Sequence, residues 1–308
     1  MEPQPGKKGG YFALTLTCTL WGTTWVASKI GVMHMPALQM AAIRQFLAGL
    51  CFLIFFMGVK KLPWPTKGQW KRLAILGLLM FVFANGLSTW SLYFIPSGLS
   101  ALIGALYPLC VALIEIVFFR SKRMSLLSAT GFILGLAGVG IVFYENAFSG
   151  LSDGFIYGIL LSLGAMISWT LGTVFIVRGN TSMNPYYATG WQMLISSVIL
   201  YIMSEILQPG LPIFNIPVEA WLVIIYLVVF GSVISFVAFI FSMKKLPAPI
   251  ASLYAYINPL VALLTGALIL GEKLTIHILY GAIVTMAGVF LVNYSIRKNE
   301  KVIAEPEI

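Results

Sequence analysis

LPAPIASLYAYINPLVALLTGALILGEKL, from Leu246 to Leu274, is the stretch of sequence that decides the fold of this chain. It carries no charged residue from Pro247 to Leu270, a length sufficient to cross a bilayer as a helix. A proline follows Asn258 inside it, and the sequence Gly-Glu-Lys closes it. A related copy, IPSGLSALIGALYPLCVALIEIVFF, occupies Ile95–Phe119 and carries Tyr107-Pro108 at the matching place. One such segment is an ordinary membrane helix, whereas two indicate a duplicated membrane protein.

The composition agrees with a chain that lies largely in lipid. Its residues are 59% hydrophobic and 9% charged, and the mean hydropathy is +0.94. Soluble domains carry roughly 25% charged residues, so a water-soluble fold is excluded. The apolar runs of roughly 20 residues are also far longer than the alternating strands of an outer-membrane barrel. The chain is therefore predicted to be an all-α membrane protein.

Apolar length and the breaks between apolar runs predict ten transmembrane helices. The connections between them are short and leave no room for a soluble domain. The predicted spans are 11–32, 36–57, 73–95, 97–119, 125–144, 154–177, 185–206, 219–242, 247–270 and 275–295.

The basic residues fall on one side of this layout. Sixteen of the 19 lysines and arginines lie before the first span, in alternate connections, or after the last span. The positive-inside rule places that side in the cytoplasm, so residues 1–10 and 296–308 are predicted to be cytoplasmic. The predicted location is the bacterial inner membrane. The net charge of +9 thus orients the helices and is no argument for a nucleic-acid partner.

The spans divide into two halves, residues 11–144 and 154–295, each with five predicted helices. When Pro108 is aligned with Pro259, Gly131 and Gly138 fall on Gly281 and Gly288 after one gap. Because five is an odd number, the two halves must insert with opposite orientation. Inverted repeats of this kind place a substrate site between the halves near the middle of the membrane.

Four motifs carry a resemblance to a known family: LWGTTWVASKIG (20–31), AAIRQFLAGL (41–50), the segment from 244 to 275 that contains INPLVALLTGALILGEKL, and GAIVTMAGVFLV (281–292). They resemble the EamA-type ten-helix carriers of the drug/metabolite transporter superfamily over nearly the whole chain. The resemblance implies a secondary transporter of small organic metabolites, most often an exporter of amino acids or related amphipathic compounds. It also implies alternating access through a central cavity, with no cofactor. The first repeat departs from the pattern, with RSKR at 120–123 where Gly-Glu-Lys/Arg is expected.

Two charged residues inside the spans are candidates for function. Arg44 lies eight residues into its span, roughly 12 Å below the outer end. A cation at that depth is energetically costly unless it is paired or faces protein or water. Arg44 therefore either binds an anionic group of the substrate or donates hydrogen bonds to helix ends as a structural arginine. Glu115 is the acidic residue farthest from the ends of the predicted spans, since Glu205 and Glu219 lie at span ends, and it is the candidate for proton coupling; the alternative is that it pairs with Arg120 or Lys122.

The remaining candidates are aromatic and amide side chains and the two prolines. Pro108 and Pro259 each remove a backbone donor, and their matched positions predict two helix bends that flank the site. Aromatic rings with a polar handle and an amide suit an amphipathic pocket, although core packing is the alternative for each of them. The predicted substrate-binding residues are Trp21, Arg44, Asn85, Trp90, Tyr107, Trp169, Tyr254 and Asn258.

Other classes of function remain to be distinguished. A flippase for a lipid-linked substrate would need a hydrophobic groove with a lateral opening. An intramembrane enzyme finds little support, because the sequence contains no HExxH, GxSxG or phosphate-loop motif. The expected partners are a small-molecule substrate, the lipid bilayer and, as a candidate coupling ion, the proton; the oligomeric state, a monomer included, is left open.

Overall fold

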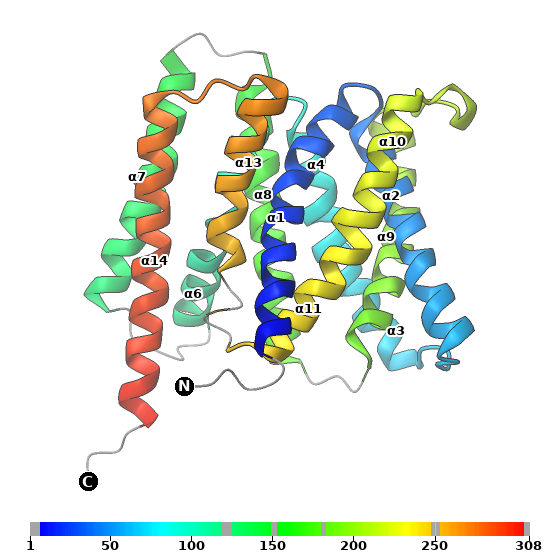
Figure 1. Cartoon of the computed structure of the whole chain (residues 1–308), viewed down its shortest axis with the longest axis horizontal. Coiled ribbons are helices and arrows are strands. Elements are labelled where there is room, and N and C mark those ends of the chain that lie inside the picture. Colours follow the sequence, from blue (N-terminus) through cyan, green and yellow to red (C-terminus); the bar gives the residue numbers. More distant parts are fainter. Residues whose placement is uncertain are drawn as a thin grey trace.

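The computed structural model describes residues 7–118, 125–148, 153–179, 183–247, 250 and 253–304. All regular structure among them is helical. α1 (Lys7–Val32) begins and α14 (Ile276–Ala304) ends at the same face of the bundle, here called the terminal face (Figure 1). Successive long helices cross to the opposite face and back. The chain is a multi-pass α-helical protein, as the sequence predicts.

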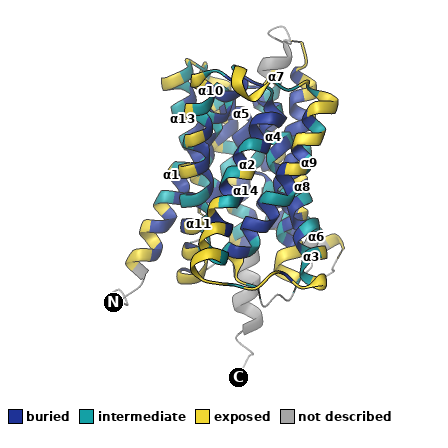
Figure 2. Ribbon diagram, turned by 90° about the vertical axis from the view of Figure 1, so that its right-hand side faces the viewer, coloured by how far each residue is buried: buried dark blue, intermediate teal, exposed yellow. Residues whose placement is uncertain are grey.

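Eight helical stretches among the described residues are long and apolar enough to cross a membrane. α1, with 26 residues, and α13 (Tyr254–Leu270), with 17, run beside them. Many large apolar residues are exposed, as expected of helices that face lipid. Figure 2 shows the buried residues gathered toward the inside of the bundle. The eight stretches are Ala37–Val59, Lys67–Ser91, Ser97–Ile114, Leu126–Tyr144, Phe155–Arg178, Pro185–Leu207, Val218–Lys245 and Ile276–Ser295.

Several stretches are built from more than one helical segment. The first of them joins α2 (Ala37–Leu53) to the π-helix η1 (Ile54–Val59). The next contains α3 (Lys67–Leu76), the π-helix η2 (Gly77–Gly86) and α4 (Leu87–Ser91). In the second half of the chain, α10 (Val218–Tyr226), the π-helix η4 (Leu227–Ile234) and α11 (Ser235–Lys245) follow one another in the same way.

The two longer π-helices lie at matching places in the sequence. Shifted by the 151 residues that separate Pro108 from Pro259, η2 falls on η4. Segments of π-helix are rare in proteins and occur often at functional sites. Their repetition in both halves is a structural correspondence that hydrophobic pattern alone does not predict.

The two proline-containing segments differ. The first breaks into α5 (Ser97–Gly104) and α6 (Tyr107–Val117), and Pro108 lies in the first turn of α6, where its missing N–H costs nothing. In the second half α13 begins at Tyr254 and continues through Pro259. The predicted span from residue 247 is therefore shorter as a helix, because the chain is already irregular at Leu246, Pro247 and Leu253.

Two antiparallel helix pairs flank the centre of the bundle. α7 (Leu126–Phe148) and α14 stand side by side at one edge, and α2 packs against α9 (Pro185–Leu207) toward the other (Figure 1). Between them lie α1, α13 and α8 (Phe155–Arg178), with α4, α5 and α11. The elements of the two halves thus interleave around a common middle.

Candidate functional site

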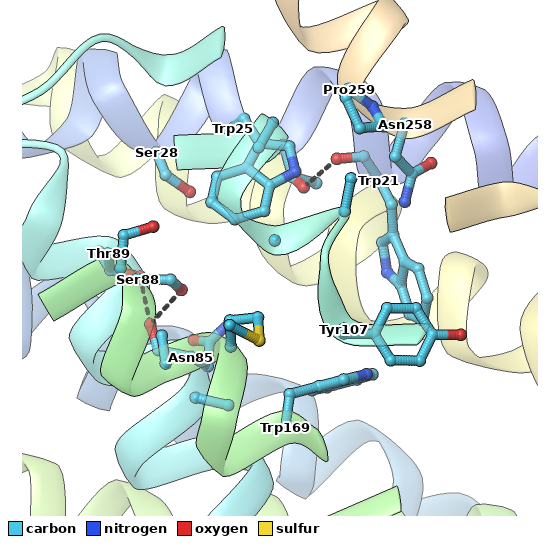
Figure 3. A pocket seen from close by; sticks show the side chains of 18 of the residues that line it. Trp21, Trp25, Ser28, Asn85, Ser88, Thr89, Tyr107, Trp169, Asn258 and Pro259 are labelled. Carbon is cyan, nitrogen blue, oxygen red and sulfur yellow. Dashed lines mark hydrogen bonds between the residues drawn. The ribbon is translucent and has the colours of Figure 1, made fainter. Parts of the chain in front are cut away.

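A cavity of about 180 Å³ lies between these central elements. Its walls come from α1, α2, η2, α4, α5, α6, α8, α11 and α13, so both halves of the chain contribute. Figure 3 shows the labelled side chains arranged around an open central space. The lining includes seven of the eight substrate-binding residues predicted from the sequence, together with one of the two prolines: Trp21, Arg44, Asn85, Tyr107, Trp169, Tyr254, Asn258 and Pro259.

Trp21 is the centre of an aromatic cluster that forms the floor of the cavity on its terminal-face side. It is held by its indole N–H, which donates to the Gly231 carbonyl at 3.2 Å. Rings from α8, α11 and α13 surround it with centroid separations of 5.0–6.2 Å, mostly edge to face, the geometry that aromatic pairs prefer. These rings belong to Trp169, Phe236, Phe239 and Tyr254.

A pair of tyrosines joins the two halves across this floor. The Tyr254 hydroxyl donates to the Tyr107 hydroxyl at 2.8 Å, and the two rings stack with centroids 6.1 Å apart. Each tyrosine is the first residue of its helix, Tyr107 of α6 and Tyr254 of α13. The contact therefore lies where α6 and α13 begin. Below it, Leu14 and Cys18 of α1 fill the space toward the terminal face.

Asn258 links α13 to α1 beside this pair. With the amide turned so that its nitrogen faces carbonyl oxygens, it donates to Cys18 O at 2.8 Å and to Tyr254 O at 3.3 Å. Asn258, predicted to bind the substrate, thus lines the cavity and also holds α13 against α1. Figure 3 shows it next to Pro259 and close to Trp21.

Arg44 is buried, with 6% of its surface exposed, and it lines the cavity. Its Nε donates to Ser232 Oγ at 3.0 Å and its Nη2 to Gly231 O at 3.4 Å, both in η4. Among the described residues it has no carboxylate partner. The arginine therefore ties α2 to the π-helix of the other half and leaves part of its guanidinium toward the cavity.

The wall opposite the floor aromatics is polar. Asn85 in η2 accepts from Gln45 Nε2 at 2.9 Å through its side-chain oxygen, and its backbone carbonyl accepts the hydroxyls of Ser88 and Thr89. Figure 3 shows these three side chains on one wall. Ser28 of α1 also lines the cavity.

Several lining residues escaped the sequence reasoning, notably Ser28, Ser88, Ser162 and Phe236. One signal could have found the first of them. Ser28 follows Trp21 by seven residues and Trp25 by three, so all three lie on one face of α1. Phe236 falls on Asn85 when the halves are shifted by 151 residues, which makes it visible only after the repeat is aligned.

Two predicted residues lie outside the described lining, and the side chain of a third is not described. Trp90 is outside the cavity lining and packs edge to face on Tyr157 with centroids 5.7 Å apart, because its side of α4 faces α8. Pro108 is in the first turn of α6 and is likewise not among the described lining residues. Glu115 belongs to α6, but its side chain lies outside the described part of the structure.

Two charged residues stabilise the face opposite the termini. Lys29 of α1 donates to the carbonyls of Leu92 and Ile95, where α4 ends. Glu272 accepts the backbone N–H groups of Ser97 at 2.7 Å and Gly98 at 3.2 Å, so it caps the N-terminus of α5. Gly271 ends α13 with φ +66°, a conformation that favours glycine and turns the chain toward α5. The Gly-Glu sequence thus connects the two halves rather than only closing its own turn.

The site has the chemistry of a binding cavity. Its polar groups hold helices together or face a small apolar space, and no nucleophile is paired with a base in the described lining. The described residues also contain no group of three His, Cys, Asp or Glu side chains that could hold a metal ion.

Comparison with known proteins agrees with this geometry. A profile of the EamA-like transporter family matches the chain twice, over residues 8–144 and 156–294. The uncharacterized inner membrane transporter YedA of Escherichia coli is 32% identical, with 87% of this chain and 84% of YedA covered. The uncharacterized transporter YoaV of Bacillus subtilis is 27% identical, with 94% and 98% covered. A protein of known crystal structure shares the fold with a TM-score of 0.65 at 16% identity, and the match covers 95% of this chain.

Proposed function

Because the chain belongs to the EamA-like transporter family and is a membrane transporter, we propose that it carries small amphipathic organic metabolites, amino acids and related compounds, out of the cell. The single observation that supports this proposal is the cavity between the two halves. Its volume of about 180 Å³ is below the roughly 300–1,000 Å³ of pockets for drug-sized ligands, so it suits a small solute. Its lining combines aromatic faces with a few polar groups.

Alternating access explains how such a cavity transports. In the present structure the aromatic floor and the Tyr107–Tyr254 pair lie between the cavity and the terminal face. We place that face in the cytoplasm on the strength of the basic connections, with ten spans across a bacterial inner membrane. For a solute to enter from the cytoplasm, the tyrosines must separate and the opposite face must close.

A flippase for lipid-linked substrates is the alternative, but a cavity of this volume favours a small solute over a large polyprenyl-linked head group. An intramembrane enzyme is disfavoured by the transporter names of its relatives. Coupling to protons stays a proposal for Glu115. If Glu115 is the coupling residue, a Glu115→Gln variant will lose uphill transport driven by a pH gradient but keep exchange between equal pools.

Purified protein in liposomes tests the proposal. The vesicles are loaded with a mixed pool of amino acids and related metabolites, and protein-dependent efflux is followed by mass spectrometry. We expect efflux of a small subset of the pool, reduced about tenfold or more in a Trp169→Ala variant that removes one wall of the floor. A Trp64→Ala variant is the matched control, because Trp64 is exposed, at 67%, outside the cavity. Absence of efflux for every solute would overturn the proposal, and chemical conversion of a solute would favour an enzyme.

A further inference from the structure

Arg44 is the one charged side chain among the described residues that line the cavity. Its guanidinium has five N–H donors, and the described contacts use two of them, to Ser232 and Gly231. The side chain is only 6% exposed, so the remaining donors lie against the protein or toward the cavity. A buried cation is costly unless a counter-charge accompanies it.

A second arginine shows what a purely structural role looks like in this molecule. Arg72 of α3 lies at the terminal face and donates through Nη2 to the carbonyls of Phe175, Ile176 and Gly179, where α8 ends. The negative end of the α8 dipole and solvent both stabilise that charge. Arg44 has no such surroundings, since its carbonyl partner is a single residue inside η4.

The other described lining residues include hydrogen-bond donors and no carboxylate. Asn85 uses its side-chain oxygen to accept from Gln45, the residue next to Arg44, so its amide nitrogen remains available to donate. The Ser28 hydroxyl lines the same space. Among the described residues the carboxylates lie at the two faces of the bundle, as Glu272 does. The described lining therefore carries one positive charge, with the Asn85 amide as a further hydrogen-bond donor.

We propose that Arg44 is the carboxylate subsite of the cavity, so that the substrates are small amphipathic carboxylates. The carboxylate binds the free side of the guanidinium, assisted by the Asn85 amide, and the apolar part of the solute packs on the floor rings around Trp21. The solute then provides the counter-charge that Arg44 lacks. This assignment rests on the proposed transport function, because it names the substrate class of the same cavity.

Matched solutes test the carboxylate requirement in the unmodified protein. 3-Phenylpropionate and 3-phenylpropionamide differ in charge but little in shape, and so do phenylalanine and phenylalaninamide at the carboxyl end. Binding to the purified protein is measured from the change in tryptophan fluorescence, and flux is measured in liposomes. We expect each carboxylate to bind on the order of ten- to hundredfold more tightly than its amide. Equal binding of acid and amide would overturn the inference.

Variants then locate the preference. Arg44→Gln is expected to remove it and Arg44→Lys to retain part of it, because lysine keeps the charge but loses the planar donor pair. Arg72→Gln is the matched control and should leave the preference unchanged. A preference that survives in Arg44→Gln would also contradict the assignment. If Arg44→Gln does not fold, the preference of Arg44→Lys between each carboxylate and its amide still tests whether Arg44 binds the carboxylate.

Failure of the inference and failure of the proposed function give different results. Efflux of amines and amides at the rate of carboxylates would leave a transporter with no carboxylate subsite. Carboxylate-selective binding without any flux would leave the subsite and remove the transport function. Absence of both binding and flux for every solute would overturn both.

Discussion

The pair α7 and α14 and the floor of the cavity both join the two halves of the chain, but they do so by different means. Between α7 and α14 the backbones touch. A Cβ on Gly138 would lie 2.4 Å from Thr285 N and 2.6 Å from Gly281 O, and one on Gly288 would lie 2.3 Å from Gly135 N. At the floor the contact is made by rings, with centroids 5.0–6.2 Å apart, and by separate side-chain hydrogen bonds, from Tyr254 to Tyr107, from Trp21 to Gly231 O and from Asn258 to Cys18 O.

The difference indicates which junction moves. Backbone contact across a row of glycines gains dispersion energy along its whole length and allows little rotation without a clash. Rings that meet edge to face can separate by rotamer changes, and each of the few neutral hydrogen bonds at the floor contributes only about 1 kcal/mol. We infer that α7 and α14 form the fixed junction and that the floor opens and closes. Three substitutions test this comparison.

The largest effect is expected from Gly138→Ala in the fixed junction. The added methyl group meets the backbone of α14, which cannot yield as a side chain could, so the helices must move apart. We expect a loss of about 3 kcal/mol and a melting temperature lower by roughly 5–10 °C. Gly140→Ala, on the same helix with nothing within 4 Å of the new Cβ, is the control. Thermal denaturation of the two purified variants is the measurement.

Equal melting temperatures for Gly138→Ala and Gly140→Ala would contradict the distinction between the two junctions, since the α7–α14 junction would then tolerate separation. The same result would remove the reason for treating α7 and α14 as fixed. A large loss of stability in Gly138→Ala together with unchanged solute binding would support the distinction, because it would show that the α7–α14 junction is separate from the cavity.

The fixed junction is also the part that sequence reasoning approached most closely. The seven-residue spacing of Gly131 and Gly138, repeated at Gly281 and Gly288, marked equivalent positions in the two halves. In the structure these equivalent glycines face each other across α7 and α14. Residue spacing along a helix is visible directly in the sequence, so both the apolar spans and the rows of glycines could be predicted from it.

The cavity was predictable in its residue types but less so in its details. Most of the aromatic and amide residues predicted for the site line the cavity, yet Trp90 lies outside it, because the sequence does not fix the rotation of α4. The π-helices leave no hydrophobic signature, so the partners of Arg44 in η4, Ser232 Oγ and the Gly231 carbonyl, could not be predicted. The cap that Glu272 forms on α5 joins residues 175 positions apart, a contact that local pattern does not encode.

An intermediate effect is expected from Glu272→Gln, because Glu272 connects the end of α13 to α5 between the two junctions. The neutral amide keeps the shape but loses the charge-assisted bonds to Ser97 N and Gly98 N, a loss of about 1–2 kcal/mol. Chemical denaturation of the purified protein measures it. Glu219→Gln is the control, because Glu219 is exposed in the first turn of α10. A change no larger than that of the control would mean that the cap contributes nothing to joining the halves.

The smallest change in stability, and the most direct test of a moving floor, is expected from Tyr254→Phe. The variant removes the hydroxyl bond to Tyr107 but keeps the ring, at a cost of about 1 kcal/mol. If the floor opens toward the terminal face, the open state becomes about fivefold more populated. Cys18, which is 2% exposed below the floor, reports this as faster labelling by a thiol reagent after Cys51 and Cys110 are replaced by serine. Tyr187→Phe removes a bond of similar length, to Pro63 O at 2.9 Å, away from the floor and should leave the labelling rate unchanged. If Cys18 is labelled at the same rate in Tyr254→Phe and in the protein with both tyrosines, the tyrosine pair does not hold the cavity closed. The floor would then be a fixed contact, as the α7–α14 junction is.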